Sequence, residues 1–164
     1  MIKSRFTIKS LFIPIIPLVI PFVMGYYILW LTDPNHPKPP ILGPVCLILL
    51  LSFTILWLIF GEIRTKIIKV TIEDQSISVR KFAGLAPRRK YLFSDVSGFK
   101  TSFLQSRAGG NEYLYIMQNE KKVIKISNLY HKNYQELKEQ VKLKTVDLGF
   151  EKFSYIDELK ETFT

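Results

Sequence analysis

The side chains with the clearest chemical potential in this chain are basic ones that gather around one expected loop. Five cations lie within eleven residues, two before and three after a short segment with glycine and proline: Arg80, Lys81, Arg88, Arg89 and Lys90. Arg64 and Lys66 directly follow a long apolar segment. Anionic lipid headgroups attract such cations by about 1 kcal/mol for each Lys or Arg near a membrane surface. These seven side chains are therefore the predicted contacts with anionic lipid headgroups.

Two other interpretations of these basic side chains compete with lipid contact: a structural role at sheet edges and membrane boundaries, and nucleic-acid binding. Lys and Arg also blunt the exposed edges of β-sheets, and they accumulate on the cytoplasmic side of membrane proteins. Nucleic-acid binding would need basic side chains interleaved with exposed aromatic ones. Tyr91 and Phe93 follow the basic loop, but strand positions favour a place for them in a core. The net charge of +9 is already explained by the two membrane segments, which cations flank on the cytoplasmic side. We therefore expect no nucleic-acid partner.

Residue patterns for catalysis and for cofactor binding are absent from the sequence. It contains no G-x-S-x-G, H-E-x-x-H or C-x-x-C pattern and no glycine loop of the kind that cradles phosphate. The two histidines, His36 and His131, lie far apart in the chain, and the single cysteine, Cys46, lies inside an apolar segment. The sequence therefore predicts a protein that is not an enzyme, with no metal site, no cofactor and no small-molecule substrate.

Two stretches without any charged side chain, residues 11–30 and 41–60, predict a membrane hairpin. A helix needs roughly 20 apolar residues to cross a hydrocarbon core about 30 Å thick. We expect transmembrane helices over residues 11–31 and 41–60, joined by a proline-rich turn over residues 32–40. Kinks in the first helix are expected at its three prolines, which are Pro14, Pro17 and Pro21.

The distribution of charge around these segments predicts their orientation. Residues 1–10 carry three basic and no acidic side chains, the turn is neutral, and cations follow the second segment. Because Lys and Arg are retained on the cytoplasmic side, we expect a cytoplasmic basic tail over residues 1–10 and an external turn. The chain is then a multi-pass protein of the cytoplasmic membrane with both termini in the cytoplasm. A cleaved signal peptide competes with this interpretation, but no A-x-A-like cleavage site follows the first apolar segment.

Residues 61–149 have the pattern of one small domain. Apolar and polar residues alternate from residue 68 onward in short runs that turn residues separate, which is typical of strands. A loop is expected over residues 107–111. Beyond residue 127 the spacing becomes helical, with a predicted start at Asn133, a stop at Gly149 and one apolar face: Tyr130, Tyr134, Leu137 and Val141.

Residues 150–164 are predicted to form an amphipathic tail. Its apolar residues lie near helical spacing: Phe153, Ile156, Leu159 and Phe163. Such a segment either packs on the domain or serves a partner, and the sequence leaves both alternatives open.

Three segments carry a resemblance to a known family. KVTIEDQSISVRK looks like an opening hairpin, KYLFSDVSGFK like a strand that leads through a turn into the next, and NYQELKEQV like a closing helix. Over residues 63–143 the chain resembles the bacterial pleckstrin-homology-like (PH-like) domains found in small membrane proteins of unknown function. The resemblance implies an α+β fold, in which a bent antiparallel sheet or partly open barrel of about six or seven strands is capped by a C-terminal helix.

Together these features predict a non-catalytic scaffold or adaptor. The membrane hairpin would present a PH-like binding module at the cytoplasmic leaflet, where the basic loop docks on anionic lipid and the module binds an unidentified protein partner. The alternative is an accessory subunit of a larger membrane complex, in which the proline-broken first helix packs on helices of its partners.

Overall fold

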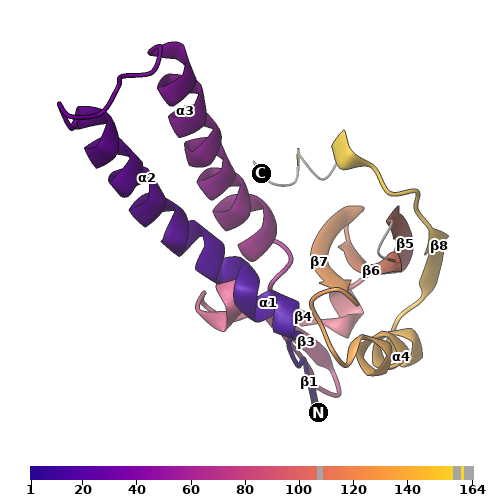
Figure 1. Ribbon diagram of the computed structural model, residues 1–164. Helices are drawn as coiled ribbons and strands as arrows, with labels where there is room; N and C mark the ends of the chain where they lie inside the picture. Colours follow the sequence, from indigo (N-terminus) through magenta and orange to yellow (C-terminus); the bar gives the residue numbers. More distant parts are fainter. Residues whose placement is uncertain (107–108, 157–159, 161–164) are drawn as a thin grey trace.

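The computed structural model describes residues 1–106, 109–156 and 160. Two long apolar helices are followed by two four-stranded sheets and a C-terminal helix (Figure 1). The prediction of a helical hairpin joined to an α+β domain is confirmed at this level.

Both helices of the hairpin are long and apolar enough to cross a membrane. The first runs through α1 (Ile8–Phe12), the 3₁₀ turn η1 (Ile13–Ile15) and α2 (Ile16–Thr32), giving 25 residues in all. The second runs through α3 (Leu42–Leu56) and the π-helical turn η2 (Trp57–Ile63), giving 22 residues. Most of their large apolar side chains are exposed in the isolated chain, as expected of surfaces that a bilayer covers.

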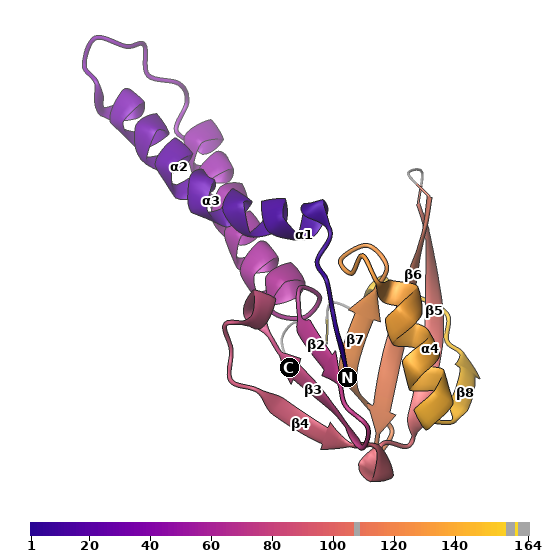
Figure 2. The same cartoon turned by 90° about the horizontal axis from the view of Figure 1, so that it is seen from below.

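The expected break in the first helix falls near its start. Pro14 lies in η1, and Figure 2 shows α1 turned away from the axis of α2. Pro17 lies in the first turn of α2, where a missing amide hydrogen costs little, whereas Pro21 lies inside this helix.

The first sheet contains residues from both sides of the hairpin. Its strands are antiparallel and lie in the order β1 (Ile2–Lys3), β2 (Lys69–Ile72), β3 (Ser76–Arg80) and β4 (Arg89–Leu92). The sequence predicted a basic tail over residues 1–10, but Ile2 pairs with Ile72 and Lys3 with Thr71 in an edge strand. A two-residue strand has too few residues to show alternation, so only its pairing with residues 68 and 70 positions further along the chain reveals it.

The rest of the N-terminal segment is also bonded to the domain. The Ser4 N–H donates to the Val70 carbonyl, and the Val70 N–H donates to Ser4 Oγ, both at 2.8 Å. Ser10 Oγ donates to the Tyr130 carbonyl at 2.7 Å, and the Lys132 N–H donates to the Arg5 carbonyl at 2.7 Å. The hairpin therefore does not hang from a flexible tail, because residues on both sides of it are fixed in the domain.

The second sheet has the order β7, β6, β5, β8. Its strands are β5 (Gly98–Ser106), β6 (Gly109–Gln118), β7 (Lys121–Ser127) and β8 (Asp147–Phe150). Part of the loop expected over residues 107–111, namely residues 107–108, lies outside the described residues, and β6 already begins at Gly109. Strand β8 pairs in parallel with β5.

The C-terminal helix is shorter than the sequence predicted. Helix α4 (Tyr134–Lys144) ends at Thr145, whose extended backbone leads into β8, so Gly149 lies within a strand and is not a helix stop. The Phe99 N–H of β5 donates to the Val146 carbonyl at 2.9 Å, which draws the chain onto the sheet. The helix thus ends before it reaches Gly149, because pairing with β5 takes the chain into a strand.

The main core lies between the two sheets and α4. As expected, Tyr134, Leu137 and Val141 form the buried face of the helix. They meet the inward-facing residues of both sheets, which are Ile68, Val70, Ile72, Ile77, Val79, Phe99, Leu114, Ile116, Ile124 and Ile126. Tyr130 precedes the helix and packs in a separate cluster with Ile63 and Ile67 at the base of the hairpin.

His131 lies at this junction between hairpin and domain. Its side chain is 1% exposed, and its ring nitrogens lie 3.0 Å from the Ser127 carbonyl and 2.9 Å from the Ile68 carbonyl. Burial lowers the pKa of His131, although the two carbonyl groups oppose this shift. The lowered pKa favours the neutral ring in the folded state, in which the ring donates to one of the two carbonyl groups, so protonation of this buried group disfavours folding.

The Ser4 contact can be tested by substitution. Ser4→Ala leaves the Val70 N–H without its side-chain acceptor, so we expect a loss of about 1–3 kcal/mol in the free energy of unfolding. Equilibrium denaturation of the full chain in detergent micelles measures this loss. Ser94→Ala, at an exposed position, is the control and should stay within about 0.5 kcal/mol of the wild type. Equal effects of the two substitutions would contradict the role given to Ser4.

The His131 environment predicts a dependence of stability on pH. A histidine whose folded-state pKa lies below its value of 6.5 contributes stability above that value, and this stability is lost as the pH falls through the folded-state pKa. We therefore expect the free energy of unfolding to decrease on mild acidification and His131→Gln to flatten the decrease. An unchanged slope in His131→Gln would refute the assignment.

Candidate functional site

A cavity of about 850 Å³ lies between the two sheets near the base of the hairpin. Strands β4 and β7 are terminal strands of their respective sheets, and residues from both line this cavity. Its apolar lining includes side chains from the main core, among them Ile68, Val79 and Ile124. Its polar lining is mostly basic and comes from Arg64, Lys81, Arg89, Lys121, Lys122, Lys125 and Lys160, with the carboxylates of Glu120 and Glu151. We call this cavity the basic cleft.

Three of these cations approach from separate elements. Arg64 directly follows η2 at the end of the second hairpin helix, Lys81 follows β3, and Arg89 begins β4. Burial lowers the pKa of Lys81, and the positive charges of Arg64 and Arg89 lower it further. Among the described residues, no carboxylate forms an ion pair with Arg64, Lys81 or Arg89. This triad is therefore a concentration of positive charge that a bound anion would relieve.

The loop that follows Lys81 is fixed to the base of the hairpin. Phe82 and Ala83 both have left-handed backbone angles, with φ of 52° and 55°, which costs energy for residues other than glycine. The Ala83 N–H donates to the Ile67 carbonyl at 2.7 Å, and Phe82 packs against the cluster of Ile63 and Ile67. These contacts hold the strained turn in place beside the end of the second hairpin helix.

Leu85 lies at the tip of this loop. It is 89% exposed and has basic residues on both sides in the chain. A large apolar side chain flanked by cations fits the boundary between lipid headgroups and hydrocarbon, where apolar burial and headgroup attraction act together.

On the β7 side, the cations are partly neutralised by the chain's own C-terminal segment. Glu151 forms ion pairs with Lys122 at 2.6 Å and Lys100 at 3.4 Å. Phe153 stacks on Tyr113 with ring centroids 5.4 Å apart. Glu151 and Phe153 of the tail predicted over residues 150–164 thus pack back on the second sheet, whereas Ile156 of its predicted apolar face is exposed. Leu159 and Phe163 of that prediction lie outside the described residues.

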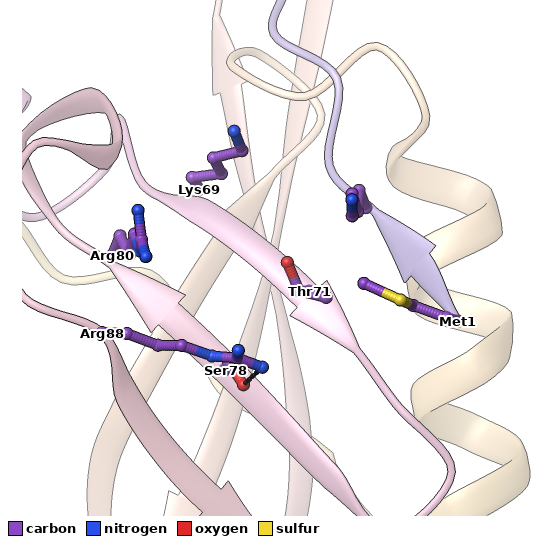
Figure 3. A pocket seen from close by; sticks show the side chains of 7 residues that line it. Met1, Lys69, Thr71, Ser78, Arg80 and Arg88 are labelled. Carbon is purple, nitrogen blue, oxygen red and sulfur yellow. Dashed lines mark hydrogen bonds between the residues drawn. The ribbon is translucent and has the colours of Figure 1, made fainter.

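The structure divides the seven predicted lipid contacts among different surroundings. Arg64, Lys81 and Arg89 meet in the basic cleft. Lys66 forms an ion pair with Glu62 at 2.6 Å. The other three lie on the opposite, outer face of the first sheet, where Figure 3 shows the pocket of Arg80 and Arg88 and where Lys90 lies 4.0 Å from Glu73.

The division follows from the alternation of side chains along a strand. Val79 faces the core, so Arg80 faces outward and Lys81 inward, and the pairing of Val79 with Arg89 places Arg89 on the inward side. The β7 lysines of the cleft, Lys121, Lys122 and Lys125, are not among the predicted contacts, although they lie on a strand that the sequence predicts. Their approach to β4 depends on the curvature of two separate sheets, for which the sequence has no direct signal.

The chemistry of the basic cleft is that of anion binding. The cleft is lined both by cations and by apolar side chains such as Ile68 and Val79. This combination suits a ligand with a phosphate group and an apolar part. No group of three or more His, Cys, Asp or Glu side chains in the described part of the chain is placed to hold a metal ion.

The repulsion within the triad predicts an unusual effect of Lys81→Gln. Because the folded state disfavours the charged form of Lys81, its removal should leave the melting temperature unchanged or raise it in a buffer of low ionic strength. Lys142→Gln, at an exposed position of α4, is the matched control. A clear loss of stability confined to Lys81→Gln would show that this ammonium group has a stabilising partner.

Comparison with protein-family models, with curated proteins and with solved structures finds no match to this chain. The resemblance to PH-like domains therefore rests on the sequence patterns and on the order of the elements. The basic cleft is defined by this chain's own residues.

Proposed function

We propose that this chain is a non-catalytic membrane scaffold whose domain is oriented on the membrane by anionic lipid. Two transmembrane helices hold a PH-like module at the cytoplasmic leaflet, and the basic cleft and its loop engage lipid phosphates. The observation that carries the proposal is the triad of Arg64, Lys81 and Arg89, which lies where the domain joins the hairpin and has no carboxylate partner among the residues that the structure describes.

The first sheet supports the placement of both hairpin ends on one side of the membrane. Strand β1 precedes the first helix and β2 follows the second, yet the two strands are hydrogen-bonded neighbours. If the hairpin crosses a bilayer, both of its ends must then lie on the same side. The cations that flank the helices favour the cytoplasmic side for these ends.

The arrangement of strands supports a PH-like module. Two sheets, antiparallel except for the pair of β5 and β8, pack around a shared core with one helix, and the sheets remain open along β4 and β7. The resemblance covers residues 63–143. Strand β1 adds one strand to the first sheet and β8 adds one strand to the second, and both lie outside that stretch.

Since the helices already fix the chain in the membrane, lipid binding is not needed for recruitment. Its effect would be on the orientation of the domain. Three cations at about 1 kcal/mol each, or roughly 3 kcal/mol, would favour the docked orientation by about a hundredfold on an anionic surface. Leu85 would add apolar burial at the same point. A domain held in one orientation presents the same surface to every protein partner.

Docking of the loop can be measured at Leu85. The full chain with Leu85→Cys in a Cys46→Ala background is labelled with a fluorophore and placed in nanodiscs. Quenching by lipid-attached nitroxide should be strong with phosphatidylglycerol and weak with phosphatidylcholine alone, and salt should reduce it. The triple variant Arg64→Gln, Lys81→Gln, Arg89→Gln should lose the effect of phosphatidylglycerol.

A matched control removes charge elsewhere. Lys132→Gln with Lys142→Gln takes two exposed cations from the segment around α4 and should leave the quenching unchanged. Quenching that ignores lipid charge in the wild type would overturn the proposal, and so would a control variant that behaves like the triple variant. In either case the search for function would turn to membrane partners of the hairpin.

A further inference from the structure

The outer face of the first sheet carries a second group of cations, on the side opposite the basic cleft. The strand register places Lys3 beside Thr71 and Thr71 beside Ser78, in one row across three strands. In the adjacent row, Lys69 of β2 lies directly opposite Arg80 of β3. Residues paired in this way share a face of the sheet, and Figure 3 shows the side chains of Lys69, Thr71, Ser78 and Arg80 around one pocket.

This pocket has a volume of about 210 Å³. Arg88 reaches over it, because its Nη2 donates to Ser78 Oγ at 2.7 Å and to Glu73 Oε1 at 2.5 Å. The hydrogen bond from Arg88 lowers the pKa of Glu73. Glu73 thus holds the guanidinium group of Arg88 beside the hydroxyl groups of Ser78 and Thr71. Among the described residues, it is the only carboxylate that forms ion pairs with the cations on this face of the sheet.

The charges in the pocket are not balanced. Lys3, Lys69, Arg80 and Arg88 line it, and Glu73 compensates only Arg88. Like charges directly opposite each other on a sheet are destabilising, as Lys69 and Arg80 are here. In the described part of the chain, Lys3, Lys69 and Arg80 form no ion pair. The fold therefore retains a repulsive pair beside a pocket, where an anion would turn repulsion into attraction.

The hydroxyl groups complete the donor set. Ser78 Oγ accepts the hydrogen bond from Arg88, which leaves its own proton free to be donated. Thr71 lies beside it in the same row. Residues with ammonium, guanidinium and hydroxyl donors thus line one small volume, and they come from β1, β2, β3 and the position before β4. Donors from several directions suit a tetrahedral oxyanion better than a planar carboxylate.

We infer that this pocket is a phosphate-binding site, distinct from the basic cleft. Lys3, Lys69 and Arg80 neutralise the anion, Thr71 and Ser78 donate to it from the floor, and Arg88 closes it from the β4 side. Its small volume suits inorganic phosphate or the phosphate group of a monoester. Because Lys3 belongs to the strand before the hairpin and the other groups follow the hairpin, the bound phosphate also clamps β1 onto the sheet.

The first measurement titrates inorganic phosphate onto the full chain in nanodiscs of phosphatidylcholine, at constant ionic strength with chloride as the balancing anion. Isothermal calorimetry should show binding, and amide hydrogen exchange should slow in β1. The double variant Lys69→Gln, Arg80→Gln should weaken binding by about tenfold or more, while the cleft triple variant should bind phosphate like the wild type. Failure of lipid docking at Leu85 would leave this titration unaffected, so the two proposals are tested separately.

Folding defects are controlled in two ways. The double variant removes a repulsive pair, so it should be at least as stable as the wild type. Thr71→Val keeps the shape and the strand preference while removing one hydroxyl donor, and it should weaken phosphate binding without lowering the melting temperature. Absence of phosphate binding in the wild type, or equal loss in the double variant and the cleft variant, would overturn the site.

The source of the phosphate is separated by a second arm. Nanodiscs that contain phosphatidic acid present a phosphate monoester from the membrane, whereas glycerol 3-phosphate presents one from solution. If phosphatidic acid abolishes the calorimetric signal of inorganic phosphate in the wild type, the site takes a lipid headgroup. If glycerol 3-phosphate competes and phosphatidic acid does not, the site takes a soluble phosphate.

Discussion

The pairing of β1 with β2 is the constraint on which the rest of this structure depends. It joins residues that precede a helical hairpin to residues that follow it, across more than 60 positions of the chain. The two hydrogen bonds between Ser4 and Val70 continue this pairing, and the bonds of Arg5 and Ser10 carry it to the segment before α4. The N-terminal segment therefore covers one edge of the first sheet and contributes Phe6 and Ile13 to the cluster below the hairpin.

Charge is organised around this frame on two sides of one sheet. The inward side carries Lys81 and Arg89, which join Arg64 at the base of the hairpin, and the outward side carries Arg80 and Arg88. Elsewhere in the described chain, several lysines have partners close by, as with Lys138 and Glu112 at 2.5 Å. The contrast matters because surface ion pairs form easily wherever a carboxylate is near. Each candidate binding site contains cations that form no ion pair among the described residues, namely Arg64, Lys81 and Arg89 in the cleft and Lys3, Lys69 and Arg80 on the outer face.

Much of the fold could be predicted because its signals are local. The two helices follow from uninterrupted apolar length, and β2 and β3 follow from the alternation around Val70 and Ile77. The buried face of α4 follows from helical spacing at Tyr134, Leu137 and Val141. The alternation of side chains along β3 also predicts that Arg80 and Lys81 lie on opposite faces of the first sheet. The prediction of a single lipid-contacting loop placed both on one surface. Strands β1 and β8 could not be predicted in this way, because each is short and is defined by a distant partner. The closeness of the β7 lysines to β4 depends likewise on the shape of the assembled domain.

The shared first sheet also sets an order of events in biogenesis. The N-terminal strand is synthesised first, yet its partner Lys69–Ile72 follows both apolar helices. Sheet closure must therefore wait until both apolar helices have been synthesised, and, if the hairpin spans a bilayer, it requires the two chain ends to lie on the same side. A chain with only one helix inserted would leave the edge of β2 bare and prone to pairing with other molecules. If the hairpin spans a bilayer, the completed first sheet would therefore occur only in chains that have both helices inserted.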